Sequence, residues 1–373
     1  MIYFDNAATT IPSKKAIDLA SKFNNEMFFN PSTLYQGGLN CSLEIKRAKE
    51  SILKNLSTTN HQVIFTSCGS ESDNMAIFCA VKRGVFITTK GEHAAVYNSF
   101  LELKNRGLEI AFIDLNEDGS VNEEKLIDFV KNNRVDFVSI FHVNNETGAI
   151  NDINSLAKKV KAINSKIIFH ADGVQAYGKL PYKLSPQIDL YSISAHKINA
   201  LKGVGALIVK KGLSIKPLIF GGGQEGGLRS GTENLFGIKV FEYAGSEKYS
   251  NLQENYLKVK QIKDYILDNL DKEYINIISG ENSSPYILSI SAPKLRGEVI
   301  MHSLEMENLI VGNGSACSSK HRYSRVLEAC GYSKDILDGV VRLSFNPLNT
   351  LEDAKKAVEI INKTILKLKG ILN

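Results

Sequence analysis

The stretch of sequence that decides the fold is His170-Ala171-Asp172-Gly173-Val174-Gln175, followed further along the chain by Ser194-Ala195-His196-Lys197. Each comes directly after an apolar run, Lys166-Ile167-Ile168-Phe169 in the first case and Ile188-Asp189-Leu190-Tyr191-Ser192-Ile193 in the second. Such runs are typical of buried strands. In an open α/β sheet, polar side chains at the carboxyl ends of strands face the ligand. The sequence therefore predicts that Asp172 and Lys197 meet at the ligand-binding edge of a sheet.

An aspartate and a lysine presented together fit one cofactor in particular, pyridoxal phosphate. The lysine amine forms a Schiff base with the cofactor aldehyde, and the carboxylate pairs with the protonated nitrogen of the pyridine ring. With that nitrogen protonated, the ring accepts electrons from a carbanion next to the substrate amine. Taken alone, Lys197 is better explained as a solvated lysine and Asp172 as a turn residue. The motifs around them reverse this and favour the cofactor.

Length and composition indicate a large globular protein. The chain has 373 residues, 43% hydrophobic and 23% charged, which is enough for a large core and two domains. The net charge of +5 includes no block of consecutive basic residues, so direct nucleic-acid binding is not expected. The first residues do not resemble a signal peptide, and no apolar stretch approaches the roughly 20 residues of a membrane span.

The cysteines point to a reducing compartment. They are an odd number, scattered along the chain, with no CxxC pair: Cys41, Cys68, Cys79, Cys317 and Cys330. This pattern argues against a disulfide framework and against a zinc site. We therefore expect a cytoplasmic protein with no membrane segment and no metal site.

Helical and extended patterns alternate between residues 43 and 210. Helices are predicted at 43–56 and 70–81, and strands at 63–65, 85–87, 109–113, 137–141, 167–169, 190–193 and 206–209. This alternation is typical of an α/β fold in which helices sandwich a mostly parallel central sheet.

The pattern changes after Gly221-Gly222-Gly223. Residues 234–270 have the pattern of one long helix, a kind of element that often connects domains. Beyond it, short strands at 286–290 and 340–344 alternate with helices at 298–306 and 351–368, which indicates a smaller α+β domain. We place the boundary inside the long helix, so residues 14–245 form a large domain, and residues 1–13 and 246–373 a small one.

Three further motifs place polar residues at predicted strand ends. Gly69 and Ser70 begin a helix, where backbone amides suit a phosphate, although this motif alone is better explained by an N-cap at Ser70. His93 follows the strand that begins at Val85, and an imidazole at that position can stack on a flat ring or move a proton. A lone histidine, however, is more often structural. Asn145, in the run at 144–148, suits a ligand cleft or merely a turn.

The second half of the chain supplies two more candidates. Cys317 lies among small residues at 312–320, unlike a buried cysteine such as Cys79, and Lys320 nearby favours its thiolate. An exposed, reactive loop thiol is therefore expected. Arg342 is a charge on an otherwise apolar strand, where either a substrate carboxylate or a structural salt bridge provides a partner.

Together these segments resemble the cysteine desulfurases of the NifS/IscS type, in the class V branch of the pyridoxal-phosphate enzymes that have the aspartate aminotransferase-like fold. The resemblance extends nearly from end to end, and each single motif is weak while their shared order is specific. The matching segments are residues 3–10, 30–32, 66–74, 92–93, 144–148, 172–175, 194–197, 221–225, 229–234, 315–319 and Arg342.

The resemblance implies a role for each candidate residue. Lys197 would be the Schiff-base lysine, Asp172 the partner of the ring nitrogen, and His93 the residue stacked on the ring. Arg342 would bind the substrate carboxylate, and Cys317 would be the nucleophile that accepts sulfur. Further cofactor contacts would come from Gln175 at the ring oxygen, from Asn145 to cofactor and substrate, and from Gly69, Ser70, Ser194, His196 and Thr232 at the phosphate, with Thr232 supplied by the other subunit of a homodimer.

The implied reaction converts L-cysteine to L-alanine and leaves a persulfide on Cys317. The sulfur would pass to an acceptor protein, either an Fe–S scaffold or a tRNA-thiolating enzyme. Two other functions remain open. A class V aminotransferase or another pyridoxal-phosphate lyase would explain Lys197 and Asp172 but gives Cys317 no role, and an inactive scaffold would have no need for the set of residues retained here.

Overall fold

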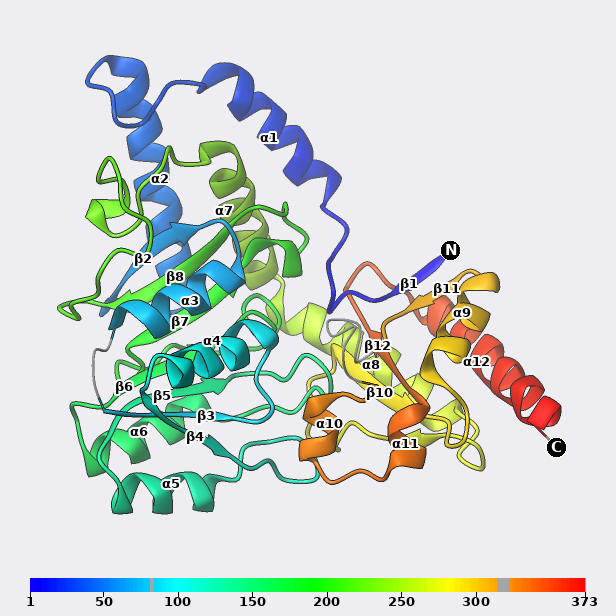
Figure 1. Cartoon of the computed structure of the whole chain (residues 1–373). Coiled ribbons are helices and arrows are strands. Elements are labelled where there is room, and N and C mark those ends of the chain that lie inside the picture. The colour runs from blue at the N-terminus through cyan, green and yellow to red at the C-terminus, as the bar shows by residue number, and fades with distance from the viewer. Residues whose placement is uncertain (81–83, 314–321, 373) are drawn as a thin grey trace.

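The structure, a computed structural model, describes residues 1–80, 84–313 and 322–372 (Figure 1). Its strands are β1 (Ile2–Phe4), β2 (His61–Thr66), β3 (Val85–Thr89), β4 (Glu109–Ile113), β5 (Val135–Phe141), β6 (Ile168–Asp172), β7 (Leu190–Ser194), β8 (Gly205–Lys210), β9 (Asn276–Ile277), β10 (Ile287–Ser291), β11 (Leu309–Val311) and β12 (Val340–Ser344).

The α-helices of the described residues are α1 (Lys14–Glu26), α2 (Gln36–Asn55), α3 (Gly69–Ala80), α4 (Ala94–Asn105), α5 (Glu123–Asn132), α6 (Ile153–Ile163), α7 (Leu235–Ser250), α8 (Leu252–Asn269), α9 (Gly297–Met306), α10 (Arg325–Ala329), α11 (Lys334–Asp338) and α12 (Leu351–Leu372). Two single 3-10 turns, η1 (Ala195–Lys197) and η2 (Glu225–Gly227), complete the set.

The centre of the molecule is a seven-stranded sheet with the strand order β2-β8-β7-β6-β5-β3-β4. The pairs from β7 through β4 are all parallel, and β8 is antiparallel to both of its neighbours. This confirms the predicted fold class, an α/β fold with a mostly parallel sheet. We call this sheet with its helices α1–α7 the large unit.

Helices cover both faces of the sheet because its strands are apolar on both sides. On one face, Val138 and Ile140 of β5 share an apolar cluster with residues of α2, α5, α6 and α7. On the other face, Phe137 of the same strand packs with residues of α3 and α4. The alternation of side chains along each strand therefore divides the core into two layers.

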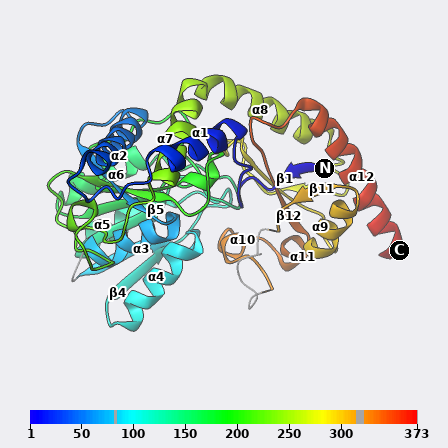
Figure 2. The same ribbon diagram turned by 90° about the horizontal axis from the view of Figure 1, so that it is seen from above.

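A second core lies in the C-terminal part of the chain, beside the large unit (Figures 1 and 2). It is built on the antiparallel sheet β12-β10-β9 and covered by α8, α9 and α12. The N-terminal strand β1 crosses over to pair in parallel with β11, so both ends of the chain belong to this part. We call β1, β9–β12 and α8–α12 the small unit.

The prediction of one long helix over residues 234–270 is wrong. The chain forms two helices there, α7 and α8, because Asn251 has the non-helical backbone angles φ −117° and ψ 21°. The Asn251 side chain donates to the carbonyl of Glu247 at 3.1 Å, a local bond that competes with the helical ladder. The expected boundary at residue 245 therefore falls inside α7, whereas the helical break lies at Asn251.

Other predicted elements differ mainly at their ends. The strands β4 and β12 have the predicted bounds, while α2 begins at Gln36 rather than at residue 43. Gly37 and Gly38 lower the helix propensity of that first turn, so the sequence pattern does not extend to it. None of the helices within the three described ranges is both long and apolar enough to cross a membrane.

Candidate active site

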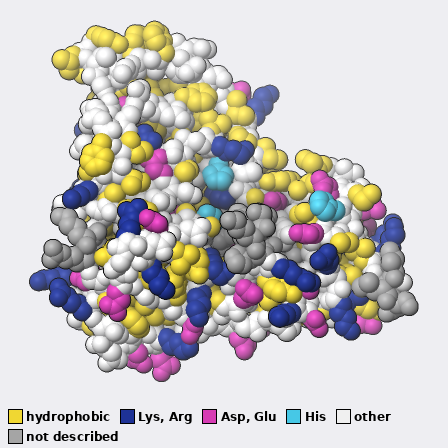
Figure 3. Space-filling model, viewed as in Figure 1, with side chains coloured by type: hydrophobic (Ala, Val, Ile, Leu, Met, Phe, Trp, Pro, Cys, Tyr) yellow, Lys and Arg dark blue, Asp and Glu magenta, His cyan; other side chains and the backbone are white. Residues whose placement is uncertain are grey.

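The candidate residues of the large unit lie along one edge of the central sheet. Gly69 follows β2, His93 follows β3, Asn145 follows β5, Asp172 ends β6, and Lys197 closes the turn η1 after β7. These five strands run in the same direction, so their carboxyl ends all open on the same side. Figure 3 shows histidine side chains at the surface near the junction of the two units, beside Lys and Arg.

Asp172 is a buried carboxylate at the end of β6. Burial raises its pKa to about 6, and the Val174 amide and the positive charge of Lys197 oppose that shift. One carboxylate oxygen accepts the Val174 N–H at 2.9 Å, which fixes the side chain. A carboxylate held in this way, close to a cationic amine, is a suitable partner for a protonated ring nitrogen.

Lys197 contacts the N-terminal segment of the chain. Its Nζ donates to the carbonyl of Ala7 at 2.6 Å and to that of Ala8 at 2.8 Å. The same Ala7 carbonyl accepts Nε2 of Gln175 at 2.9 Å, and Oε1 of Gln175 accepts the amine of the buried Lys179 at 2.7 Å. Lys197 and Gln175 therefore share the Ala7 carbonyl, and Gln175 in turn binds Lys179.

His93 caps the start of α4. Its Nδ1 accepts the Ala95 N–H at 3.1 Å, so that nitrogen carries no proton in this arrangement. Burial, together with the positive charges of Lys197, Arg325 and Arg342, lowers the pKa of His93 to about 4. The imidazole is therefore neutral near pH 7, with its one proton on Nε2.

The start of α3 and the end of β7 form a small polar cradle. Ser194 is buried, and its Oγ has no hydrogen-bond partner among the described residues. A Cβ on Gly69 would lie 2.9 Å from Cγ2 of Val174 and 3.4 Å from Cβ of Ser194, so only glycine allows this approach. Together with the N–H groups of the first turn of α3, the hydroxyl suits a phosphate.

Two expected phosphate ligands have other surroundings. Nδ1 of His196 lies 3.1 Å from Oγ1 of Thr9, and burial lowers the pKa of this imidazole to about 4. Thr232 is exposed on the loop before α7, in a hollow of about 160 Å³ that Ser67 and Arg229 also line. Ser70, in the first turn of α3, is exposed as well.

Arg342 approaches the site from β12 in the small unit. Nη2 pairs with Asp5 at 2.8 Å, and Nη1 donates to the Asn145 carbonyl at 2.8 Å. Nε is buried and has no partner among the described residues. A Cβ on Gly312 would lie 3.2 Å from this Nε, so Gly312 packs closely against the guanidinium. Arg342 is thus part of a salt bridge, and its Nε is a buried donor whose hydrogen bond is not satisfied among the described residues.

Cys317 lies outside the described residues, as does Lys320. The chain continues on the small unit with Arg322, which makes a two-point ion pair with Asp338 at 2.9 and 2.8 Å. The other four cysteines are free thiols, three of them buried.

Several buried groups of the site had no signal in the sequence. The carbonyls of Ala7 and Ala8 act through the backbone, so no side chain indicates them. Two residues before Asp172, Nδ1 of His170 lies 2.8 Å from Oγ of Ser139, and Nε2 lies 3.0 Å from Oγ of Ser192. The same Nε2 is 3.6 Å from Oδ1 of the buried Asp73. Period-two alternation places His170 and Asp172 on the same face of β6, which is the one pattern that pairs them.

The donors and acceptors of this site fit pyridoxal phosphate. A buried carboxylate, a nearby lysine amine, a neutral imidazole and an unpartnered hydroxyl beside a helix N-terminus are the groups that its ring, aldehyde and phosphate need. Among the described residues, no group of three or more His, Cys, Asp or Glu side chains is placed to hold a metal ion.

Known proteins share this architecture. Residues 2–356 match the family described as Aminotransferase class-V. A protein named cysteine desulfurase IscS, from Dictyoglomus turgidum, is 35% identical over 384 residues, which cover 99% of this chain and 96% of that protein. A solved structure titled NIFS-LIKE PROTEIN has a TM-score of 0.91 and 31% identity, over 98% of this chain and 99% of that one. Another, titled SspA in complex with cysteine, has a TM-score of 0.80 and 27% identity, over 93% and 99%.

Fold and site together define the class V aminotransferase family, whose members depend on pyridoxal phosphate. Within this family the chain belongs to the cysteine desulfurases of the NifS/IscS type. The resemblance inferred from the sequence motifs is thereby confirmed.

Proposed function

We propose that this protein is a cysteine desulfurase, which uses pyridoxal phosphate to convert L-cysteine to L-alanine and leaves the sulfur as a persulfide on Cys317. The observation that carries the proposal is the buried Asp172 and the half-buried Lys197 at neighbouring strand ends, in a chain that matches a protein named cysteine desulfurase over 99% of its length. The structure titled as a complex with cysteine supports the choice of substrate.

The residues that would hold the cofactor surround that pair. Lys197 would bind its aldehyde, Asp172 its ring nitrogen, Gln175 its ring oxygen and His93 its face. Its phosphate would lie on Ser194, with the remaining ligands Gly69, Ser70 and His196 from the same chain and Thr232 from a second copy, and Asn145 would contact both cofactor and substrate. When bound, pyridoxal phosphate supplies an electron sink for the carbanion at the substrate Cα.

The protein residues divide the remaining work between them. Arg342 would bind the substrate carboxylate, and Nε is the donor of its guanidinium that has no partner among the described residues. The amine of Lys197 takes the proton from the substrate Cα, and His93 acts as the acid/base group for the substrate thiol, with Nδ1 releasing the Ala95 N–H when it takes the proton. The Cys317 thiolate then attacks that sulfur.

This step balances in atoms and electrons. The new S–S bond forms as the C–S bond of the substrate breaks, so the sulfur is oxidised to the persulfide level while the carbon is reduced. A proton replaces sulfur at Cβ, which gives L-alanine, and no external oxidant or reductant is needed.

The test is incubation of the purified protein with L-cysteine, with and without added thiol reductant. A desulfurase produces alanine and sulfide in equal amounts when the reductant regenerates Cys317. A class V aminotransferase would instead produce a keto acid, and another lyase would release sulfide without alanine. An inactive scaffold would produce neither, and it would show no cofactor absorbance that borohydride abolishes.

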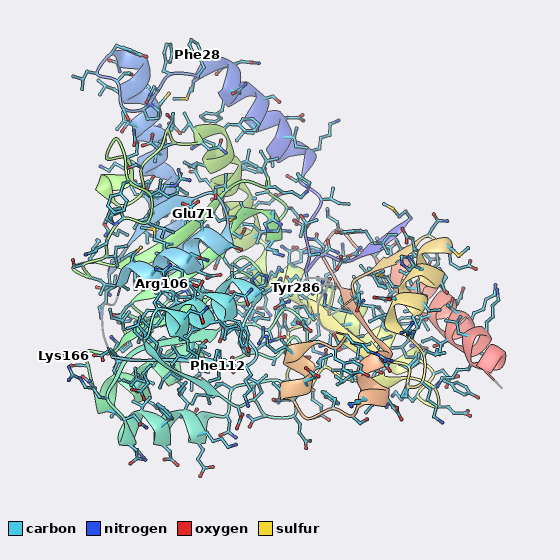
Figure 4. The ribbon with its side chains drawn as sticks, viewed as in Figure 1. Phe28, Glu71, Arg106, Phe112, Lys166 and Tyr286 are labelled. Atoms are coloured by element: carbon cyan, nitrogen blue, oxygen red, sulfur yellow. The ribbon has the colours of Figure 1, made fainter. Side chains whose placement is uncertain are left out.

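A homodimer is part of the proposal. The tip formed by α1, α2 and the loop between them exposes large apolar side chains, among them Phe28 at 71% and Leu34 at 88% (Figures 3 and 4). Thr232 is exposed too, and its neighbour Arg229 is fixed by Glu71 at 2.8 Å, so the loop is presented outward. Light scattering should give twice the 41.2 kDa of one chain. A monomeric mass with full activity would reject the dimer.

Acceptor, compartment and domain boundaries complete the proposal. Free thiols at Cys41, Cys68, Cys79 and Cys330 support a reducing compartment, the cytoplasm. The separate apolar clusters support a large domain at 14–245 and a small domain made of 1–13 and 246–373.

The acceptor of the sulfur is an Fe–S scaffold protein or a tRNA-thiolating enzyme. Persulfide transfer to each of them, followed by mass spectrometry, identifies which one it is.

A further inference from the structure

The short helix α10 of the small unit lies against the large unit (Figures 1 and 2). Ser324 caps this helix, and its hydroxyl also donates to the carboxylate of Glu146 in the large unit. An apolar contact adds to this bond, between Val326 and Cys330 on the small unit and Leu115 and Phe141 on the large one. The start of α10 is therefore a point where the two units are joined.

Arg325, the first residue of α10, makes the most extensive of these contacts. Nη1 donates to the carbonyl of Lys90, and Nη2 donates to the carbonyl of Glu92 at 2.5 Å. Its Cζ lies 3.7 Å from the centre of the Tyr97 ring, so the guanidinium also makes a cation–π contact. All three partners belong to the turn after β3 and the first part of α4, which together flank His93.

Arg322 provides a contrast within the same segment. Its guanidinium pairs with Asp338, so that both partners belong to the small unit. Arg325 in turn reaches across to the other unit. Burial lowers the pKa of Arg325, while Tyr97, Glu146 and Glu92 oppose the shift. A buried guanidinium needs acceptors in place of the water that it has lost. Here the two carbonyls and the Tyr97 ring are those partners.

The turn that carries His93 is also held without Arg325. Nδ2 of Asn144 donates to the carbonyl of Gly91 at 2.9 Å, and the carboxylate of Glu92 accepts the N–H of Phe141 at 3.0 Å. This turn is therefore fixed to the large unit by its own contacts. Removing Arg325 should thus loosen the start of α10 rather than move His93.

We propose that Arg325 is a positioning residue for sulfur transfer, because it holds the start of α10 against the turn that carries His93. The proposal rests on the proposed function, since Cys317 precedes Arg325 by only eight positions (325 − 317) and must reach the substrate bound on the large unit. A reacting group misplaced by about 1 Å can lose roughly 100-fold in rate.

Three variants of the full-length holoenzyme test the proposal. Arg325→Met removes the charge and both carbonyl contacts, Arg325→Lys keeps the charge but not the forked geometry, and Arg322→Met is the matched control. For each we would measure kcat and KM for alanine release, the absorbance change of the cofactor on adding L-cysteine, and hydrogen exchange in the peptide covering residues 324–332.

We expect Arg325→Met to lower kcat by about 10- to 100-fold, with KM and the absorbance change near wild type. Exchange at residues 324–332 should quicken, Arg325→Lys should recover part of kcat, and Arg322→Met should stay within about twofold of wild type. A general loss of structure would instead lower the bound cofactor and the absorbance change as well.

Unchanged kcat in Arg325→Met, or an equal loss in Arg322→Met, would overturn the proposal. So would unchanged hydrogen exchange at residues 324–332, a result that does not depend on activity. If the wild-type protein itself releases no alanine, the proposed function is wrong. The exchange data still show in that case whether Arg325 holds α10.

Discussion

On one side of the candidate site, Asp172, Ser194 and Lys197 stand at the ends of two neighbouring strands of a single sheet. On the other side, Gly312 and Arg342 come from the small unit, together with the helix α10 that follows the segment of Cys317. We call these the sheet side and the small-unit side. Backbone ladders fix the strands of each side within its own unit, whereas the second side is set against the first by contacts between the units, such as that of Arg342 with the Asn145 carbonyl.

This difference separates two kinds of chemistry. The sheet side offers a buried carboxylate, an amine and an imidazole, the groups that hold a cofactor and move protons. The small-unit side offers an arginine donor and, in sequence, the nucleophilic cysteine. Changes on the sheet side should therefore abolish every step, while changes on the small-unit side should leave the cofactor in place and impair substrate binding or sulfur transfer.

The largest effect is expected at Lys197. Lys197→Ala should abolish turnover completely, because the other lysine amine described at the site, that of Lys179, is buried and bonded to Gln175. Borohydride should fix no cofactor to the variant, as measured by mass spectrometry. Lys211→Ala, an exposed lysine beyond the end of β8, is the control and should behave as wild type. Cofactor fixed to an active Lys197→Ala protein would contradict the sheet-side assignment.

The next effect, at Cys317, separates the two sides. Cys317→Ser should lower alanine and sulfide release by at least about 100-fold, because a serine hydroxyl stays protonated near neutral pH and attacks sulfur poorly. The same sample should still bind cofactor and show its absorbance change with L-cysteine. Near-normal alanine release from this variant would reject the persulfide mechanism and favour a lyase or an aminotransferase.

A smaller effect is expected at Gly312. A Cβ there would lie 2.5 Å from Oδ1 of Asp5 and 2.9 Å from Nη2 of Arg342, so Gly312→Ala should displace the guanidinium. Losing one hydrogen bond to a charged group costs about 1.5–3 kcal/mol, so KM for L-cysteine should rise by roughly tenfold or more. In Gly370→Ala an added Cβ meets nothing within 4 Å, and KM should not change. An unchanged KM in Gly312→Ala would remove Arg342 from substrate binding.

The two sides also differ in how far the sequence predicts them. On the sheet side, apolar runs that end in Asp172 and Lys197 predict the strands, their common edge and the cofactor, because strand periodicity is local. The contact of Lys197 with the Ala7 and Ala8 carbonyls could not be predicted, since backbone groups leave no pattern.

The small-unit side depends on contacts between distant segments. Arg342 pairs with Asp5 through the crossover of β1, and the pairing of β1 with β11 has no local signal. The sequence therefore predicts that Arg342 has either a carboxylate side chain or a substrate carboxylate as its partner, but it does not predict which of the two. The continuous helix predicted over residues 234–270 failed at one residue, because Asn251 adopts non-helical backbone angles that the apolar pattern does not show.

The smallest effect concerns pH and the sheet side alone. Burial lowers the pKa of His170 to about 3, whereas histidine in an unfolded chain titrates near 6.5. Its contribution to stability is complete above about pH 6.5 and is lost as the pH falls toward 3, by about 1.4 kcal/mol per pH unit. His170→Gln should be less stable than wild type near pH 7.5, because it disturbs the bonds to Ser139 and Ser192. Since glutamine does not titrate, the difference should shrink by about 1 kcal/mol between pH 6.5 and 5.5, as measured by urea unfolding. A difference that stays constant over this range would mean that His170 is not held neutral beneath Asp172.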